Sequence, residues 1–392
     1  MRIAYITPYQ GPSLLKRRPT LHNRSLAATV KIELIAELLY RNSHEVEIIS
    51  QGEVDKFQCR FYPSFAEAER FHPKISVFYC SALPLRFLTG YWEGMRARHV
   101  LKIRHRRCPF DMVIIYNMKR AQLACANYAI RCLGLPVILE YEDDVFVSVT
   151  GQTVNGKIAE IRRAAYNKLL EKVSGGVAVS PHLMSQLPDK VPKLLLRGVV
   201  DENVIKLNEE MGNAKRNWVF FGGTHTKSKG IGQLIEAWKT MELPDWELHI
   251  AGYGESTAAF EKMAEGNRTI VFHGVKRGRA LAQLLCSARI CINPHDLSET
   301  PGNVFAFKII EYLAAGAHVV TTPMGKLENE IEAGITYLPN NSPEAIAATL
   351  KRVIQTEAWK RGAARYVQET YGPAAVSKSL DQLIRNVVNA RT

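Results

Sequence analysis

The segment from Ile290 to Pro323 constrains the fold of this chain more than any other part of the sequence. It reads ICINPHDLSETPGNVFAFKIIEYLAAGAHVVTTP and predicts, without interruption, a buried strand, a polar loop, a helix and a second buried strand. The helix should end at Gly316, because a residue without a Cβ adopts a left-handed C-cap at no steric cost. The run HVVTT then predicts a short parallel strand, so the segment indicates an α/β fold.

The same segment carries a candidate ligand site. A loop that leads into a helix offers unpaired backbone N–H groups to a phosphate. Glu311, about one turn inside the predicted helix, adds a carboxylate that accepts two hydroxyl hydrogen bonds. This combination predicts a site for a nucleotide sugar. The alternative is a solvated helix carboxylate, which the apolar neighbours Ile309, Ile310 and Leu313 disfavour.

Strand-like runs alternate with helical patterns along the whole chain, as in parallel sheets with helices on both faces. In the first half the predicted strands read RIAYIT, EVEIIS, MVIIY, PVILEY and GVAVS, and a helix is expected from about Leu26 to Arg41. In the second half they read WVFFGG, ELHIAG, IVFHG, RICINP, HVVTT and ITYLP. Because 392 residues are too many for one ordinary core, we expect two doubly wound domains.

Composition excludes several classes of protein. Hydrophobic residues make up 46% and charged residues 23%, with no low-complexity tract, as in a globular protein. No apolar run approaches the roughly 18 residues that a membrane span needs, and the start MRIAYITPYQGP lacks the apolar core of a signal peptide. We therefore expect a cytoplasmic location. The seven cysteines (59, 80, 108, 125, 132, 286 and 291) form no CxxC pair, which argues against a zinc site and a disulfide framework.

The Ile290 to Pro323 segment closely resembles retaining glycosyltransferases of family 4. In that family a helix like EYLAAGAHVV carries the second glutamate of a paired motif, and the first glutamate lies eight positions earlier and binds hydroxyls of the donor sugar. Here the second position is Glu311 and the first is Asn303, an uncharged amide that a turn would equally accommodate. The resemblance covers nearly the whole chain and implies two Rossmann-like domains facing a cleft, the GT-B fold.

The segment KLLLRGVVDENVIKLN resembles the crossover between the two domains of that family. We expect an acceptor-side domain at 1–198 and a nucleotide-sugar domain at 199–374, with a C-terminal helix at about 375–392 that packs back on the first domain. Ligands in such folds bind beyond the carboxyl ends of the strands. The alternative is a single domain with an acidic metal-binding triplet, for which Glu142, Asp143 and Asp144 would qualify.

The resemblance places the donor in the second domain. Lys229 in WVFFGGTHTKSKGIGQLIEAW matches a lysine beside the donor diphosphate, although a lysine in a mobile surface loop is the alternative. An arginine position of the family falls on Gly223, which leaves Thr224, His225 or Lys227 to replace it. Gly252 and Gly254 of HIAGYGES would let the backbone approach the donor, or would merely shape a turn. The expected donor-binding residues are Gly222, Gly223, Thr224, Lys229, Gly252, Gly254, Val275, Lys276, Asn303, Val304, Phe305 and Glu311.

In the first domain the run ITPYQGPSLLKRRPT stands where the family has a glycine-rich loop against the donor. Only Gly11 remains of those glycines, and Lys16, Arg17 and Arg18 add positive charge. These four residues are our expected acceptor site, and the acceptor is expected to be anionic, with an ordinary exposed loop as the alternative.

The family commonly places a histidine or an aspartate after the strand that reads PVILEYEDD here. Glu142 takes the histidine position and Asp143 follows it. A carboxylate there would orient the acceptor or stabilise positive charge at the anomeric carbon, and a strand-end turn with solvated acids is the alternative. We expect Glu142, Asp143 and Lys229 to be catalytic. No cofactor or metal is expected. In the reaction that the resemblance implies, the departing phosphate takes the acceptor proton.

Net charge is +13, which favours acidic partners. The densest basic cluster, RARHVLKIRHRR from Arg96 to Arg107, follows the apolar and aromatic run ALPLRFLTGYWEGM. This order predicts peripheral contact with an anionic membrane at its inner face, with a solvated basic helix as the alternative. The cluster lacks a recognised nucleic-acid-binding motif, so nucleic acid is not an expected partner.

These observations lead to one function and one alternative. The resemblance implies a hexosyltransferase-type glycosyltransferase that moves a sugar from a nucleoside-diphosphate donor to a hydroxyl acceptor with retention of anomeric configuration. The acceptor is a saccharide, a lipid-linked saccharide or a glycolipid, as in polysaccharide biosynthesis. The alternative is a catalytically weak nucleotide-sugar-binding or scaffold subunit, because Asn303 and Gly223 depart from the family pattern.

Overall fold

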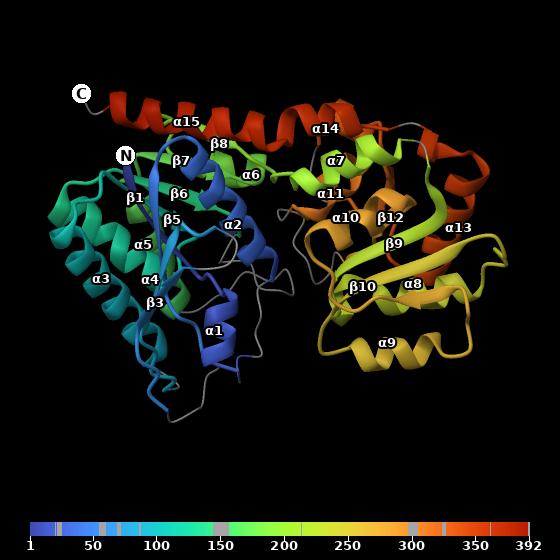
Figure 1. Cartoon of the computed structure of the whole chain (residues 1–392), viewed down its shortest axis with the longest axis horizontal. Helices are drawn as coiled ribbons and strands as arrows, with labels where there is room; N and C mark the ends of the chain where they lie inside the picture. The colour runs from blue at the N-terminus through green and yellow to red at the C-terminus, as the bar shows by residue number, and fades with distance from the viewer. Residues whose placement is uncertain are drawn as a thin grey trace. The chain divides into compact units, whose positions relative to one another are not determined.

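The computed structural model describes residues 1–390 except 20, 22–25, 55–59, 69–71, 86–87, 144–156, 213, 297–304, 324–326 and 361. The chain divides into two compact units, which are described separately (Figure 1). The first unit holds the described residues of Met1–Phe146, Val154–Leu196 and Val376–Thr392. The second unit holds the described residues of Arg197–Ala375. The units divide between 196 and 197, whereas the sequence placed the domain boundary between 198 and 199.

The first unit is built on a sheet whose strand order is β3-β4-β2-β1-β5-β6-β7-β8. Neighbouring strands are parallel throughout, except that β3 runs antiparallel to β4. The strands are β1 (Arg2–Thr7), β2 (Glu45–Ser50), β3 (Phe65–Ala68), β4 (Ser76–Tyr79), β5 (Met112–Tyr116), β6 (Val137–Tyr141), β7 (Gly175–Ala178) and β8 (Lys193–Leu195). Every residue of β5 and β6 is buried, as expected for central strands that are covered on both faces.

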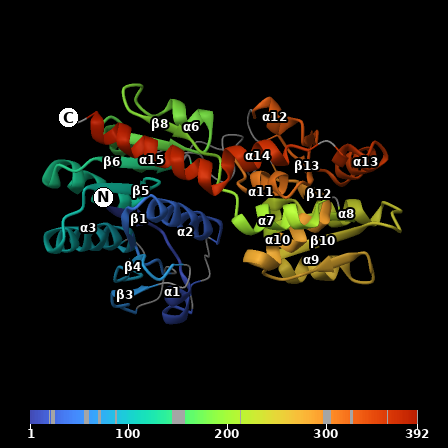
Figure 2. The same ribbon diagram turned by 45° about the horizontal axis from the view of Figure 1, so that its top comes forward.

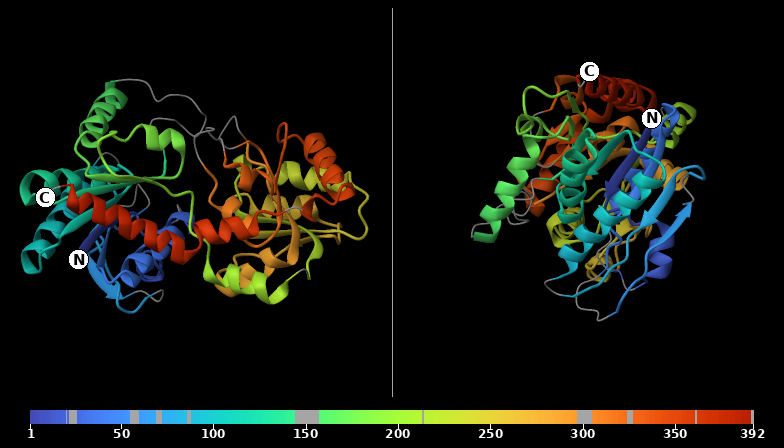
Figure 3. Two further views of the ribbon diagram at one scale, coloured as in Figure 1. Left: turned by 90° about the horizontal axis from the view of Figure 1, so that it is seen from above. Right: turned by 90° about the vertical axis from the view of Figure 1, so that its left-hand side faces the viewer.

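Helices cover both faces of this sheet (Figures 2 and 3). Buried side chains of α3, α4, α5 and α6 pack with Val113, Ile115 and Leu139 on one face. On the other face α2 and α15 pack against Ile114 and Ile138. Successive side chains of a strand point to opposite faces of the sheet. Both faces are therefore apolar, and helices pack on each of them. The helices are α1 (Pro12–Arg17), α2 (Leu26–Arg41), α3 (Thr89–Arg107), α4 (Arg120–Tyr128), α5 (Lys157–Leu170), α6 (Pro181–Ser185) and α15 (Pro373–Asn389), with a π-helical turn at Ala129–Leu133.

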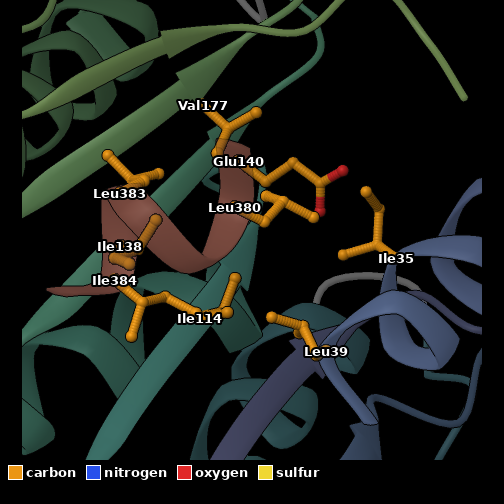
Figure 4. A pocket seen from close by; sticks show the side chains of 9 residues that line it. All are labelled: Ile35, Leu39, Ile114, Ile138, Glu140, Val177, Leu380, Leu383 and Ile384. Carbon is orange, nitrogen blue, oxygen red and sulfur yellow. The ribbon is translucent and has the colours of Figure 1, made fainter. Parts of the chain in front are cut away.

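The C-terminal helix α15 completes the core of the first unit, although the rest of the second unit separates it from that core in the sequence. Figure 4 shows Leu380, Leu383 and Ile384 of α15 around one small pocket, together with Ile114 of β5 and Leu39 of α2. The three α15 side chains are at most 4% exposed. The helix expected at about 375–392 is therefore present, and it packs on the first unit.

The second unit contains a fully parallel sheet of order β11-β10-β9-β12-β13-β14. The strands are β9 (Arg216–Thr224), β10 (Glu247–Tyr253), β11 (Ile270–Phe272), β12 (Ala288–Asn293), β13 (His318–Thr321) and β14 (Ile335–Tyr337). The helices are α7 (Glu202–Met211), α8 (Ile231–Lys239), α9 (Thr257–Ala264), α10 (Gly278–Ser287), α11 (Lys308–Ala314), α12 (Asn329–Glu332), α13 (Pro343–Gln355) and α14 (Ala364–Tyr371), with 3-10 turns at Lys227–Lys229 and Ala358–Lys360.

Adjacent phenylalanines of β9 show how this sheet is covered on both faces. Phe221 joins a core formed with α8, α9 and α13. Phe220 points to the opposite face, where its ring meets the edge of Tyr312 on α11 at 6.1 Å between centroids. Gly316 follows α11 with φ of +74°, which confirms the predicted left-handed end of that helix. The α/β class with two doubly wound sheets is therefore confirmed.

All eleven strands expected from the sequence are present, but three further strands were missed. β3, β4 and β8 are three or four residues long, and only β4 is largely buried. The run after β1, expected as a loop, contains the short helix α1, which Pro12 begins.

We predict that Ile384→Ala destabilises the first unit, because the isoleucine is 2% exposed and its loss leaves a cavity against the sheet. The expected loss is about 2 to 5 kcal/mol in the free energy of unfolding, measured by urea denaturation. Lys378→Ala, at an exposed position of the same helix, is the control and should change stability little. Equal stability of both variants would mean that α15 does not contribute to the core.

Candidate functional site

The candidate donor site lies at the carboxyl edge of the second unit's sheet. Strands β10, β9 and β12 are neighbours there, and parallel strands end at the same edge. Gly223 of β9 pairs with Gly252 of β10, and both have positive φ values, +150° and +134°. A Cβ on Gly252 would collide with the carbonyl oxygen of Gly223. Glycine is thus required at this edge for close approach of two backbones, whether or not a ligand binds.

An open pocket adjoins this glycine pair. It is lined by residues that follow β9 and β10, by α9 and by the end of β11, among them His225, Gly254, Thr257 and Phe272. His225 is buried, and its Nδ1 lies 3.0 Å from the Thr257 hydroxyl. Most of the expected donor-binding residues lie along this sheet edge: Gly222, Gly223 and Thr224 end β9, Gly252 and Gly254 end β10, and Val275 and Lys276 follow β11. Val275 is 50% exposed, so its side chain is open to solvent.

Lys229 lies in the 3-10 turn between β9 and α8. Its backbone N–H donates to Thr226, and Gly230 follows in the left-handed conformation, packed against the Pro294 carbonyl. The positive charge of Lys229 contributes to the lowered pKa values of His295 and Lys308. This electrostatic coupling places the Lys229 side chain near residues that follow β12 and begin α11.

The residues after β12 and at the start of α11 bring further polar groups to this edge. His295 is 3% exposed, and neither ring nitrogen has a hydrogen-bond partner among the described residues. The buried Lys308 Nζ likewise has no hydrogen-bond partner in the described structure. It lies 4.4 Å from the centre of the Phe221 ring. Burial lowers the pKa of both side chains, and the charge of Lys229 lowers them further.

Glu311 lies three residues after Lys308 on α11. Burial raises the pKa of its carboxyl to about 8, with a further contribution from the charge of Asp201, while Lys308 acts in the opposite direction. The carboxyl therefore binds its proton more tightly than a solvated one, which disfavours the alternative of a solvated helix carboxylate. Because α11 has only seven residues, its amino terminus alone makes a weaker case for a phosphate site than the sequence indicated.

Three further expected donor residues belong to the segment before α11. Asn303 and Val304 lie outside the described residues. Phe305 is 7% exposed, and the Arg197 guanidinium lies 5.1 Å from the centre of its ring. Phe305 thus packs within the second unit. Sequence reasoning did not select Lys308 or His295, although Lys308 shares a helix face with Glu311 at a spacing of three residues.

A second polar cluster lies in the first unit, at the carboxyl end of β6. Glu142 forms an ion pair with Lys31 of α2, and the Lys31 Nζ lies 3.7 Å from Glu140. The Tyr5 hydroxyl donates to Glu140. Asn117, with φ of +59°, accepts from the backbone N–H groups of Glu142 and Asp143, and its amide donates to the Asp143 carboxylate at 2.9 Å.

This acidic cluster holds two buried carboxyl groups but one lysine. Burial raises the pKa of Glu142 to about 8, and the neighbouring Glu140 adds to the shift while Lys31 opposes it. Burial also raises the pKa of Glu140. Because two carboxylates cannot both pair fully with a single ammonium, the cluster retains a proton near neutral pH. Glu142 and Asp143 are therefore held in defined positions, unlike solvated acids at a strand-end turn.

The structure gives the four expected acceptor residues different environments. Gly11 precedes α1, and Lys16 and Arg17 are exposed at its last turn. Arg17 lies 3.4 Å from Glu67. Arg18, in contrast, is 2% exposed and donates to the carbonyl oxygens of Gly52 and Cys80. Its guanidinium binds main-chain groups, so the structure favours an architectural role for Arg18 over acceptor contact.

Neither a metal centre nor a membrane span is apparent in the part of the chain that the structure describes. No group of three histidine, cysteine, aspartate or glutamate side chains is arranged to hold a metal there. The acidic triplet is described at Glu142 and Asp143, and Asp144 lies outside the described residues. None of the described helices is long and apolar enough to cross a bilayer.

Comparisons with known proteins bear on this arrangement. Residues 215–356 match the family described as "Glycosyl transferases group 1". This range contains β9 to β14 and nearly every residue of the candidate donor site. No curated protein matches the chain.

Solved structures match over the full length. A sucrose-phosphate synthase from Thermosynechococcus elongatus has a TM-score of 0.71 at 15% identity, with 100% of both chains covered. The HepE protein of Anabaena, in complex with UDP and glucose, has a TM-score of 0.65 at 14% identity, with 98% of this chain and 99% of that chain covered. The catalytic domain of starch synthase IV from Arabidopsis thaliana, bound to ADP and acarbose, has a TM-score of 0.62 at 11% identity, with 99% of both chains covered. These matches confirm the GT-B fold.

The acidic cluster leads to a prediction about pH. A carboxyl whose pKa is raised on folding stabilises the protein below its unfolded pKa and loses that contribution as pH rises through the folded value. For Glu142 the pH range over which this stabilisation is lost runs from 4.5 to about 8. Between these pH values the wild type should lose up to about 1.4 kcal/mol per pH unit relative to Glu142→Gln, measured by urea unfolding at several pH values. Glu160→Gln, at an exposed position of α5, is the control. If the stability of all three proteins changes with pH in the same way, Glu142 does not hold a proton in the way that this prediction requires.

Proposed function

We propose that this protein is a glycosyltransferase that moves a sugar from a nucleoside-diphosphate donor to a hydroxyl acceptor. The observation that carries the proposal is the polar carboxyl edge of the second unit's sheet, where Glu311, Lys229 and Lys308 are coupled electrostatically. This edge belongs to the part of the chain that matches glycosyl transferases group 1. The titles of similar structures name UDP, UDP-glucose and ADP, which supports a nucleotide-sugar donor.

The donor-side roles follow from charge and hydrogen-bonding capacity. Lys229 matches the phosphate oxygens of a diphosphate as a point charge. Glu311 accepts hydrogen bonds from ribose hydroxyls, as an acidic residue does in dinucleotide folds. The close backbone approach at Gly223 and Gly252 leaves room for a ligand beside the strand ends.

The chemical step breaks the bond between the anomeric carbon and the diphosphate oxygen and forms a bond from that carbon to the acceptor oxygen. The acceptor proton passes to the departing phosphate, and the anomeric configuration is retained. No metal or cofactor enters this step. In the first unit Glu142 and Asp143 orient the acceptor or stabilise positive charge at the anomeric carbon, and Asn117 fixes both backbones. The acceptor is a saccharide, a lipid-linked saccharide or a glycolipid, as in polysaccharide assembly.

The donor assignment is tested with a panel of nucleotide sugars. The purified protein should be stabilised thermally by nucleoside diphosphates and should release nucleotide from one of the sugars in the presence of chelator. Glu311→Gln should weaken nucleotide binding by about tenfold or more, because an NH2 group, which cannot accept a hydrogen bond, replaces one of the two carboxyl oxygens. Glu330→Gln, at an exposed position of α12, is the control.

The outcomes separate the two functions. Nucleotide release with a saccharide acceptor supports transfer. Nucleotide binding without turnover of any sugar would favour a weak binding or scaffold subunit, to which Asn303 and Gly223 point. Absence of any nucleotide binding would contradict both.

A surface of the first unit supports a membrane-associated acceptor. Four of its exposed large hydrophobic residues lie near the start of α3, namely Phe61, Leu88, Tyr91 and Met95. The ring of Phe61 meets the edge of Trp92 on α3 at 6.2 Å between centroids, so these residues form one patch. Basic residues follow along the same helix, with Arg98, Arg106 and Arg107 exposed. We infer that this α3 patch contacts a membrane surface that carries anionic lipid, with aromatic groups at the interface and basic groups at the headgroups.

Sedimentation with lipid vesicles tests the α3 patch. Binding should be stronger to vesicles with anionic lipid than to zwitterionic vesicles and should weaken with salt. Arg98→Gln with Arg106→Gln should weaken partition by roughly fivefold for each charge removed, because each basic residue contributes about 1 kcal/mol. Tyr91→Ser with Met95→Ser should also weaken it. Ile161→Ser removes a 70% exposed hydrophobic residue from α5 and is the control. Equal sedimentation of all variants would contradict membrane contact at α3.

A further inference from the structure

Lys308 has an environment that the rest of the fold does not explain. Its amino group is buried and has no hydrogen-bond partner in the described structure. The neighbouring groups are the Phe221 ring at 4.4 Å, the carboxyl of Glu311 on the same helix and the like charge of Lys229. A buried amino group without a hydrogen bond destabilises the folded state, and a nearby cation adds to that cost. Packing alone would favour an apolar residue at this position.

The space beside Lys308 depends on Gly223. A Cβ placed on Gly223 would lie 2.9 Å from the Lys308 Nζ, closer than such atoms approach in proteins. Gly223 is also the position at which the resembling family has an arginine. The structure therefore places a cationic side chain beside the end of β9 after all, but the cation comes from α11 instead of from the strand itself.

Two buried histidines lie near Lys308. His295 is 97% buried, being 3% exposed, and both of its nitrogens are unpaired within the described residues. The charges of Lys308 and Lys229 act on His295, and the charge of Lys308 also acts on His225. The His225 Nε2 is also buried, and it lies 3.1 Å from where a Cβ on Gly252 would be. Lys308 thus lies beside Gly223 and His225 beside Gly252, while His295 is close enough to Lys308 for their charges to interact.

We call Lys229, Lys308, His225 and His295 the basic cluster, and its charge decides which ligand it can bind. Two lysines and two histidines belong to it, and among the described residues the carboxyl of Glu311 acts on Lys308 and that of Glu261 acts on His225. A metal cation would be repelled by the lysines, whereas an anion would receive hydrogen bonds from the unpaired nitrogens. The position beyond the carboxyl ends of β9 and β12 is where ligands bind in open α/β sheets.

We propose that Lys308 and His295 bind the diphosphate of the nucleotide-sugar donor, and that Lys308 supplies the cation that Gly223 does not. This inference rests on the proposed function. Binding would give the Lys308 amino group a charged partner and His295 an acceptor for a ring N–H. The function of the site explains why an unpaired amino group is retained at the expense of stability.

The test is a comparison of Lys308→Met with the wild type, using UDP, ADP, GDP, pyrophosphate and the corresponding nucleosides as probes in isothermal titration calorimetry. Methionine has a similar length and no charge, so it should pack in the same space and raise the thermal midpoint of the unliganded protein. It should weaken binding of the preferred nucleoside diphosphate by about 10- to 100-fold and leave binding of the nucleoside unchanged. His295→Leu should act in the same direction on the diphosphate. Lys262→Met, at an exposed position of α9, is the matched control.

A higher thermal midpoint together with weaker binding of the nucleoside diphosphate would support the proposal. Replacing a lysine that is only structural would not produce this combination. A variant that binds the nucleoside diphosphate as tightly as the wild type would overturn it, while the proposed function would stand on the wild-type affinity. Equal weakening for nucleoside and nucleoside diphosphate would also overturn it, since Lys308 would then not act on the phosphates. A wild type that binds pyrophosphate but no nucleotide would overturn the donor assignment, and a wild type that binds none of the probes would overturn both proposals.

Discussion

The close approach of two backbones at the end of β9 and β10 is the constraint on which the candidate donor site depends. Gly223 and Gly252 pair in register, and a side chain on either would strike its neighbours. Because neither residue projects a Cβ, the space above the strand ends is filled by side chains that arrive from later in the chain. His295 follows β12 and Lys308 begins α11, so the polar groups of the site come from loops and a helix that the sheet positions.

Each unit gathers polar groups at the carboxyl edge of its sheet, but with opposite balances of charge. In the second unit, Lys229, Lys308 and His295 lie near Glu311 in the described part of the chain. In the first unit, Glu140 and Glu142 share Lys31. Burial acts on both sets in the same way, since it favours the neutral form of every group and therefore lowers the pKa of Lys308 and raises that of Glu142. Under the proposed function, the basic groups of the second unit would face the anionic donor. The acidic groups of the first unit would face the positive charge that develops at the anomeric carbon.

The sequence predicted much of the fold because hydrophobic periodicity is a local property. The strands of both central sheets were recognisable as short apolar runs between helical patterns, whereas β3 and β8, which are short and only partly buried, left no such pattern. The site was predictable only in part. Arg18 looked like part of a basic loop, and its burial against the carbonyls of Gly52 and Cys80 arises from tertiary packing. Lys308 looked like an ordinary helix lysine, because the absence of a partner for a side chain is visible only once its surroundings are known.

The two departures from the family pattern in the second unit act together on charge. Asn303 takes the place of a glutamate and removes one negative charge, and Gly223 takes the place of an arginine and removes one positive charge. Lys308 returns a positive charge beside Gly223, so the segment NVFAFKIIE from residues 303 to 311 carries one lysine and one glutamate and has no net charge. The departures therefore leave a lysine of α11 beside the end of β9, where the family pattern has an arginine on the strand, and this is the arrangement from which the diphosphate proposal is argued.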